Sequence, residues 1–414
     1  MRFACLLLVA LAPNVALGDE IRLSDAEAAA MRDEVLRLGE LTAPPRIHDA
    51  EAFETADGIR PIFFDALPHE GRGTRVFAWL GVPQSDEPVP GVVLVHGGGG
   101  TAFREWVARW NDEGFAAISI AVEGQTALRE ATAGQTDQRA PVSKQWQRHA
   151  WAGPRRVGIY GDSGRPLADQ WMTHAVAATV LANSLLRSQP GVDADAVGIM
   201  GISWGGVIAS TAIGIDTRFR FAIPTYGCGS LADAANQYGR ALGGNEVYRD
   251  VWDPILRLDR ATMPTLWLTW TGDKHFPLDA VADCYRTSPA PHLLALLPNM
   301  RHGHAPGWRP ADSYAFARSV VRSGQPWCEQ TATERDGDAV TVRFRCDRAV
   351  DAAELVFTTG DGFTGLREWT TTEASLTRDG DAVRVGATIP DDATAWFVRL
   401  SAAGLAACSD YQTQ

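Results

Sequence analysis

From Arg75 onward, short apolar runs bounded by glycine and proline alternate with stretches of helical character. Runs of this kind are typical of strands buried on both faces, and the clearest helical stretch between them is 175–186. The runs are residues 91–95, 116–120, 197–200, 221–224, 264–269 and 292–297. Strands that alternate with helices pack into a mostly parallel sheet with helices on both faces. We therefore expect an α/β fold with a doubly wound, mostly parallel sheet.

Residues 1–18 have the pattern of an export signal. Arg2 supplies the basic start, 3–12 the apolar core, and Ala16-Leu17-Gly18 the small-residue cleavage site. The apolar run is too short to span a bilayer. We expect a mature chain of roughly 19–414 that is secreted or periplasmic; the alternative is an uncleaved membrane anchor.

The charge balance excludes two classes of binding partner. The 414 residues include 38 basic and 50 acidic ones, for a net charge of −12. Nucleic acids and anionic membranes bind clustered Lys and Arg, so neither is an expected partner.

No Cys-x-x-Cys spacing occurs, which disfavours a zinc or redox motif. Five cysteines follow the export signal, so disulfide formation would leave at least one thiol over.

The chain is longer than one typical domain, so we expect one large core and a smaller module. Segment 19–70 is predicted to hold a helix, opened by a capping box, and an extended stretch. The core is expected at 71–324, with a lid-like excursion at 124–170 that is rich in Gly, Gln, Arg and Pro. Strictly alternating strands joined by Asp-Gly turns predict a small antiparallel β-sandwich at 325–414.

The motif Gly201-Ile202-Ser203-Trp204-Gly205 follows the strand predicted at 197–200 and precedes a helix-compatible stretch, 207–213. In a nucleophile elbow, a serine lies on such a strand-to-helix turn, and glycines two residues before and after it let neighbouring chain pass close by. Ser203 is therefore the expected nucleophile.

The base is sought downstream, because folds with this elbow carry serine, acid and histidine in that order. His302 lies four residues beyond Pro298, on the loop after the last predicted strand, and is our choice. His304 is the alternative. A metal site at these two histidines would lack a third ligand of suitable spacing.

The acid is expected after the penultimate strand, where it can orient the imidazole and stabilise its charged form. Asp273 lies in the turn after strand 264–269 and fits this place. Asp279 is the reserve, although a carboxylate in the first turn of a helix is commonly placed there by the helix dipole.

Backbone amides must receive the oxyanion. One is expected from Trp204, the residue after the nucleophile, and the other from Gly98 or Gly99 in the glycine run after strand 91–95. Glycines suit this place because they leave the amides unshielded.

The glycine run allows a second interpretation. Gly97-x-Gly99-x-x-Ala102 satisfies a dinucleotide fingerprint, and Glu123 follows the next strand at a distance suited to a ribose hydroxyl. This alternative loses because exported proteins seldom use NAD, and because it leaves the serine elbow unexplained. No cofactor is expected.

Four motifs together resemble a bacterial family within the dienelactone hydrolase and acetyl xylan esterase branch of the α/β-hydrolases. They are His96-Gly-Gly-Gly-Gly-Thr-Ala-Phe-Arg-Glu-Trp106, Gly201-Ile-Ser-Trp-Gly-Gly206, Pro224-Thr-Tyr-Gly-Cys-Gly229 and His302-Gly-His304. The resemblance covers roughly residues 70–320. It implies an α/β-hydrolase fold and cofactor-free hydrolysis of carboxylic esters, with acetyl or other short acyl groups on carbohydrates as expected substrates. Arg301 before the histidine and Trp270-Thr-Gly before Asp273 depart from the family pattern and leave the substrate open.

The expected reaction is acyl transfer through Ser203, His302 and Asp273, with a small-molecule or carbohydrate ester as partner. Two rivals remain open. One is a serine peptidase of the same fold, and the other is a non-catalytic carbohydrate-binding module that retains the elbow. The oligomeric state does not follow from the sequence.

Overall fold

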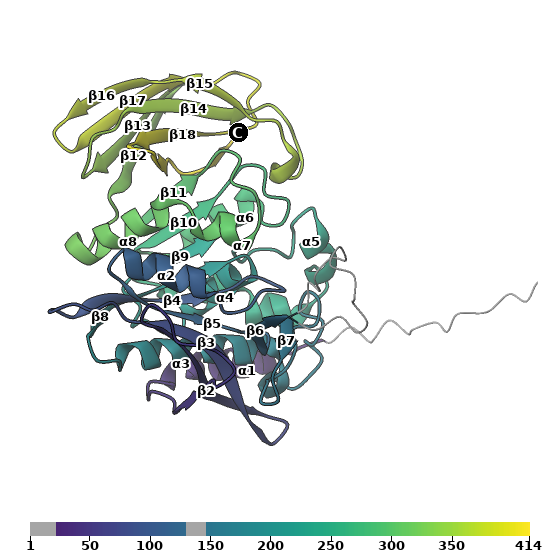
Figure 1. Ribbon diagram of the computed structural model, residues 1–414. Helices are drawn as coiled ribbons and strands as arrows, with labels where there is room; N and C mark the ends of the chain where they lie inside the picture. The colour runs from purple at the N-terminus through teal and green to yellow at the C-terminus, as the bar shows by residue number, and fades with distance from the viewer. Residues whose placement is uncertain (1–21, 130–145) are drawn as a thin grey trace, which may run out of the picture.

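The computed structural model describes residues 22–129 and 146–414, and the predicted export signal lies outside them (Figure 1). In this part of the chain, one sheet of 14 strands runs through the molecule. Its strands, in spatial order, are β1 (Ile47–Asp49), β2 (Ile59–His69), β3 (Arg72–Gly81), β5 (Ala116–Ile120), β4 (Val89–Val95), β8 (Val192–Ile202), β9 (Ala222–Thr225), β10 (Thr265–Thr269), β11 (His292–Leu296), β19 (Leu405–Cys408), β18 (Ala395–Ala402), β14 (Ala352–Thr358) and β15 (Thr370–Glu373), with β20 (Gln412–Thr413) paired to β18.

The centre of this sheet is parallel. Strands β5, β4, β8, β9, β10 and β11 are neighbours in that order and run in the same direction. Val93 of β4 lies in register between Ile118 of β5 and Ile199 of β8, and all three side chains are fully buried. Burial on both faces explains why these strands are continuous apolar runs. The predicted mostly parallel sheet is confirmed.

Two groups of helices cover the sheet. Helices α3 and α4 pack against each other and against β8, whereas α2 and α8 meet through the rings of Trp110 and Tyr314. The helices are α1 (Asp25–Arg37), α2 (Arg104–Asp112), α3 (Trp171–Arg187), α4 (Trp204–Ala212), α5 (Gln237–Leu242), α6 (Leu278–Thr287), α7 (His304–Trp308) and α8 (Ala311–Ser323), with short 3₁₀ or π turns η1 (Leu38–Glu40), η2 (Leu167–Asp169), η3 (Tyr248–Trp252), η4 (Pro254–Arg260) and η5 (Thr364–Leu366). Within the described residues, none of these helices is long and apolar enough to cross a membrane.

The N-terminal segment joins the sheet directly. Ser24 and Glu27 form the predicted capping box at the start of α1, with the Ser24 amide donating to the Glu27 carboxylate at 2.8 Å. Strand β2, expected only as an extended stretch, pairs with β3 over its length, from Ile59 opposite Gly81 to His69 opposite Arg72. In the predicted excursion, β6 (Gln125–Arg129) pairs with β7 (Trp146–Arg148), and residues 130–145 lie outside the described part.

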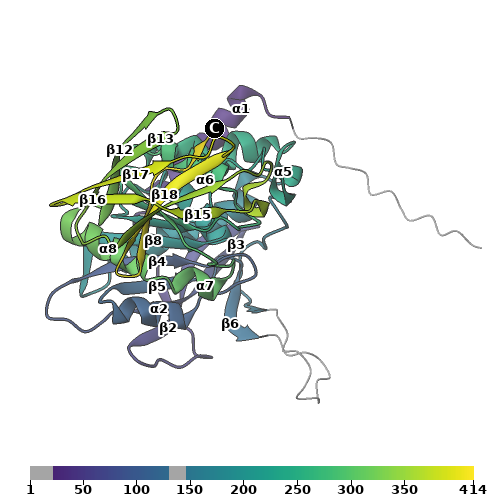
Figure 2. The same ribbon diagram turned by 90° about the horizontal axis from the view of Figure 1, so that it is seen from above.

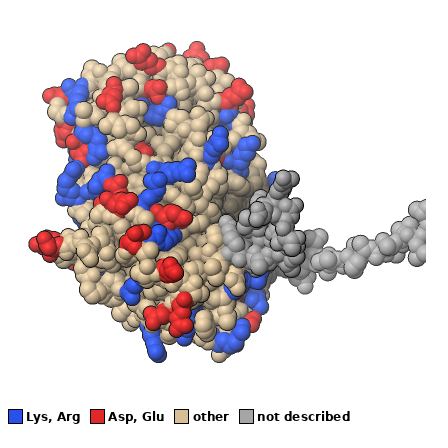
Figure 3. Space-filling model, viewed as in Figure 1, with Lys and Arg blue, Asp and Glu red and all other residues tan. Residues whose placement is uncertain are grey.

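The C-terminal region is antiparallel, as predicted, and it extends the main sheet. One layer consists of β12 (Cys328–Asp336), β13 (Ala339–Cys346), β17 (Ala382–Thr388) and β16 (Ser375–Asp379). The other layer belongs to the main sheet, because β19 pairs with β11 at Cys408 and Leu294. Figures 1 and 2 show these strands stacked at the end of the molecule that carries α6 and α8. Acidic and basic side chains are interspersed over the face drawn in Figure 3.

Candidate active site

Ser203 lies on the turn between β8 and α4, with φ of 57° and ψ of −118°. These angles lie outside the regions that L-residues ordinarily occupy, as an elbow requires. The two flanking glycines allow the turn, since a Cβ on Gly201 would collide with the carbonyl of Gly205, and one on Gly205 would collide with that of Val95. The motif therefore forms the strand–turn–helix geometry that its spacing predicted.

Three of the predicted site residues form one hydrogen-bonded row. His302 Nε2 lies 2.9 Å from Ser203 Oγ, and His302 Nδ1 lies 2.8 Å from Asp273 Oδ2. Asp273 is 1% exposed, and its second oxygen accepts from the amides of His275 at 2.7 Å and Phe276 at 3.0 Å. The serine comes from the end of β8, the acid from the turn after β10, and the histidine from the loop after β11.

Aromatic rings and a tyrosine hydroxyl hold the His302 loop. The ring centroid of His302 lies 4.5 Å from that of Tyr226 and 4.4 Å from that of His275. The Tyr226 hydroxyl donates to the carbonyl of Gly303, next to the histidine. The imidazole therefore has little freedom to turn away from Ser203.

The two alternates lie apart from this row. His304 begins α7, and its Nε2 lies 3.2 Å from the Gly97 carbonyl oxygen instead of contacting Ser203. Burial lowers the pKa of His304 to about 4. Asp279 is exposed in the first turn of α6, where Tyr411 interacts with it. Among the described residues, no group of three or more His, Cys, Asp or Glu side chains could hold a metal ion.

The glycine loop after β4 lies directly beside the nucleophile. A Cβ on Gly97 would lie 3.0 Å from Ser203 Cβ. Fully buried His96 anchors the loop, with Nδ1 2.7 Å from the Gly97 carbonyl oxygen and Nε2 accepting from the Val122 amide at 3.0 Å. The loop therefore has fixed geometry at the place where oxyanion donors are needed.

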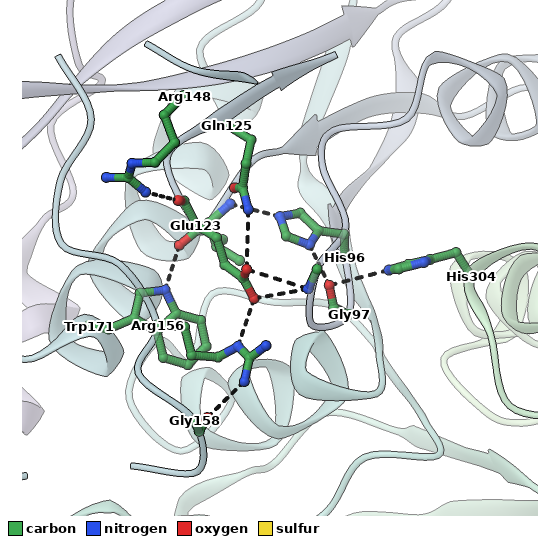
Figure 4. Close-up of polar contacts among 11 residues, drawn as sticks. His96, Gly97, Glu123, Gln125, Arg148, Arg156, Gly158, Trp171 and His304 are labelled. Atoms are coloured by element: carbon green, nitrogen blue, oxygen red, sulfur yellow. Dashed lines mark hydrogen bonds and ion pairs between the residues drawn. The ribbon is translucent and has the colours of Figure 1, made fainter. Parts of the chain in front are cut away.

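The two candidate glycines in this loop differ. The Gly99 amide donates to the Glu123 carboxylate at 3.3 Å (Figure 4), which departs from its expected role as an oxyanion donor. Because the Gly99 N–H already donates to this carboxylate, it is not available to stabilise an oxyanion. No hydrogen bond within the described residues engages the Gly98 amide or that of Trp204, at the start of α4.

In the dinucleotide alternative, Glu123 would bind a ribose hydroxyl. In the structure its carboxylate faces the glycine loop. Its carboxylate pairs with Arg156 Nε at 2.7 Å. Sequence reasoning missed Arg156, which lies in an irregular segment with no recognisable motif. Only the Pro-Arg-Arg run at 154–156, inside the predicted excursion, marked the place.

Comparison with known proteins agrees with the fold. Residues 61–234 match the family model described as acetyl xylan esterase. No curated protein gave a significant match. Acetyl xylan esterase 1 from Thermoanaerobacterium sp. JW/SL YS485 superposes with a TM-score of 0.51 at 18% identity, covering 67% of this chain and 88% of that one. Acetyl xylan esterase from Paenibacillus sp. R4 gives 0.51 at 20% identity, covering 71% and 93%. The α/β-hydrolase fold and the resemblance to the acetyl xylan esterase branch are thereby confirmed.

Proposed function

We propose that this carboxylic ester hydrolase of the acetyl xylan esterase type is an exported enzyme that removes acetyl or other short acyl groups from carbohydrates. Ser203 is the nucleophile, His302 the general base and Asp273 the residue that orients it. The observation that carries the proposal is the hydrogen-bonded row from Ser203 Oγ through His302 to the buried Asp273 carboxylate. Export rests on the signal pattern at 1–18.

The row supports a defined proton path. His302 Nδ1–H donates a hydrogen bond to the Asp273 carboxylate, which stays ionised. This fixes the tautomer in which the Nε2 lone pair faces Ser203 Oγ. His302 takes the serine proton as Oγ attacks the ester carbonyl carbon. The imidazolium that forms is stabilised by the Asp273 carboxylate, whose burial strengthens this interaction.

The second half of the reaction uses the same residues. The amides of Trp204 and Gly98 receive the negative charge of the tetrahedral intermediate, and His302 returns its proton to the departing alcohol. Water then gives a proton to His302 and attacks the acyl-enzyme, which releases the carboxylic acid and restores Ser203. No step needs an electron donor or acceptor.

Two assays test this proposal. The wild type should hydrolyse p-nitrophenyl acetate and release acetate from acetylated xylo-oligosaccharides. Ser203→Ala should lower kcat by roughly 10⁴–10⁶-fold in both assays. Ser230→Ala should not, because the hydroxyl of this half-buried serine on the next loop donates to Asp283, away from the hydrogen-bonded row. Equal rates for Ser203→Ala and the wild type would refute the proposal. Cleavage of peptides but not of esters would favour the serine peptidase instead.

A further inference from the structure

An ion pair between half-buried Arg156 and buried Glu123 lies beside the proposed catalytic residues and has no part in the mechanism above (Figure 4). Glu123 is 9% exposed, and its carboxylate accepts from Arg156 Nε at 2.7 Å, Gln125 Nε2 at 3.1 Å and the Gly99 amide. Burial works to raise the pKa of Glu123, but interactions with His96 and Arg156 hold it below its ordinary value. Glu123 is therefore ionised, and Arg156 is its counter-ion.

Arg156 is fixed from several sides, and one of its amino groups is unused. Nη1 donates to the Gly158 carbonyl at 2.7 Å. The guanidinium carbon lies 5.1 Å from the ring centroid of Trp204 and 5.9 Å from that of Trp171. Nη2 makes no hydrogen bond with any residue in 22–129 or 146–414. Among these residues, a rigid cation thus keeps one N–H pair for a further acceptor.

The unused amino group borders the proposed oxyanion loop. A Cβ on Gly98 would lie 2.8 Å from Arg156 Nη2 and 2.8 Å from Trp204 Cδ1, so both groups touch the same glycine. Trp204 directly follows Ser203 in the chain. An ester whose carbonyl oxygen meets the amides of Gly98 and Trp204 would bring its neighbouring atoms toward Nη2.

Two more cations adjoin the proposed triad. Lys274 follows Asp273, and Arg301 precedes His302; both side chains are exposed. Neither makes an ion pair or side-chain hydrogen bond in the part of the chain that the structure describes. The acids beside them are already engaged, Asp273 with His302 and Glu123 with Arg156. In a chain of net charge −12, unpaired basic groups are therefore found next to the site.

We propose that Arg156 binds an anionic oxygen of the substrate, so that the enzyme prefers esters carrying a carboxylate close to the scissile bond. This inference rests on the proposed esterase function. A guanidinium N–H makes a charge-assisted hydrogen bond with a carboxylate, and Arg156 is held for this by Glu123. The carboxylate belongs either to the acyl half or to the alcohol half, as in an acidic sugar. The recognition chemistry is the same, and the test separates the two sources.

The test uses two matched ester pairs in which only the charge differs. In the acyl pair, an aryl ester of succinate is compared with that of succinamate. In the alcohol pair, an acetylated methyl glucuronoside is compared with its uronamide. The wild type should favour the carboxylate member of one pair about ten- to a hundredfold in kcat/KM, as one charge-assisted hydrogen bond predicts. Arg156→Gln should remove this preference.

Two control variants separate recognition from folding. Arg155→Gln removes the same charge from the adjacent residue, which is exposed and makes no hydrogen bond or ion pair among the described residues, and it should keep the preference. Arg156→Lys retains a cation and should keep part of the preference for the carboxylate ester. This variant keeps the test decisive even if Arg156→Gln folds poorly because Glu123 has lost its counter-ion. Loss of the preference in Arg155→Gln as well would contradict the assignment.

The remaining outcomes are distinguishable. If both members of each pair are hydrolysed at equal rates through Ser203, the inference about Arg156 is wrong and the esterase proposal stands. If Arg156→Gln slows both members by the same factor, Arg156 has only a structural role. If no ester is hydrolysed, both proposals fail.

A second, independent observation concerns the cysteines. Cys328 and Cys346 lie directly opposite each other on the antiparallel strands β12 and β13, both fully buried, with their sulfur atoms in contact at 2.7 Å. We infer that these two thiols form a disulfide in the exported protein. Thiol–disulfide exchange with glutathione disulfide or a protein disulfide would remove two protons and two electrons from the pair and reduce the donor to two thiols.

Refolding the purified chain in glutathione redox buffers, alkylating it in denaturant so that buried thiols react, and mapping its peptides by mass spectrometry tests this pair. The peptides of Cys328 and Cys346 should be linked, while Cys408, buried on β19, should be alkylated. Alkylation of both Cys328 and Cys346 at every glutathione ratio would refute the pairing.

Discussion

The backbone of Gly365 lies directly against the backbone carbonyl of Asp273, so closely that a Cβ on the glycine would collide with that oxygen. The neighbouring Thr364 is fully buried, and its hydroxyl accepts from the amide of Leu278, at the start of α6. The C-terminal region therefore packs behind the turn that carries the proposed catalytic acid. We infer that this region helps to fix the position of Asp273.

This contact predicts that Gly365→Ala impairs catalysis. The added methyl group must displace the Asp273 turn, which would move the carboxylate relative to His302. We expect kcat to fall about tenfold or more, because small misplacements of catalytic groups are costly, and Tm to fall as well. Gly360→Ala is the matched control, since its nearest neighbour would be 3.5 Å away. Unchanged kcat in Gly365→Ala would show that the C-terminal region does not position the acid.

The choice between the two candidate acids predicts unequal variants. Asp273→Asn keeps the shape of the side chain but loses the charge and the acceptor that set the His302 tautomer. We expect kcat to fall about 10⁴-fold with the fold intact. Asp279→Asn changes an exposed helix residue and should leave kcat within about twofold, since exposed substitutions typically have small effects. Steady-state ester hydrolysis measures both, and similar losses would contradict the assignment.

His304 predicts a pH dependence of stability. Burial lowers its pKa from 6.5 to about 4, so between these values the unfolded chain binds a proton that the folded protein does not. Stability is therefore lost as the pH falls from 6.5 to 4. His304→Gln removes this contribution, so the wild type should lose more stability over that range, by roughly 3 kcal/mol at most. Urea unfolding at several pH values measures the difference in unfolding free energy between the wild type and His304→Gln. A difference that does not change with pH would contradict this explanation.

Much of the parallel sheet was predictable because its strands are buried on both faces. The run 116–120 coincides with β5, and 292–297 differs from β11 by one residue. The connection between the C-terminal region and the main sheet was not predictable. It depends on β19, four residues whose pairing with β11 is set by contacts more than a hundred positions apart.

The same contrast holds at the site. The order of Ser203, Asp273 and His302 follows from local motifs after strands, so sequence reasoning could bring them together. The partner of the Gly99 amide could not be predicted, because Glu123 reaches it only through tertiary packing. Arg156 has no periodicity or motif around it, and its pairing with Glu123 appears only in three dimensions.

Covalent labelling tests the central claim most directly. A fluorophosphonate, which reacts with activated serines, should modify the wild-type chain at one peptide, the one containing Ser203. Labelling should be lost in His302→Ala, because the base 2.9 Å from Ser203 Oγ is removed. It should persist in His304→Ala, whose imidazole faces the Gly97 carbonyl. Modification of another serine, or equal labelling of both histidine variants, would contradict the assignment of Ser203 and His302.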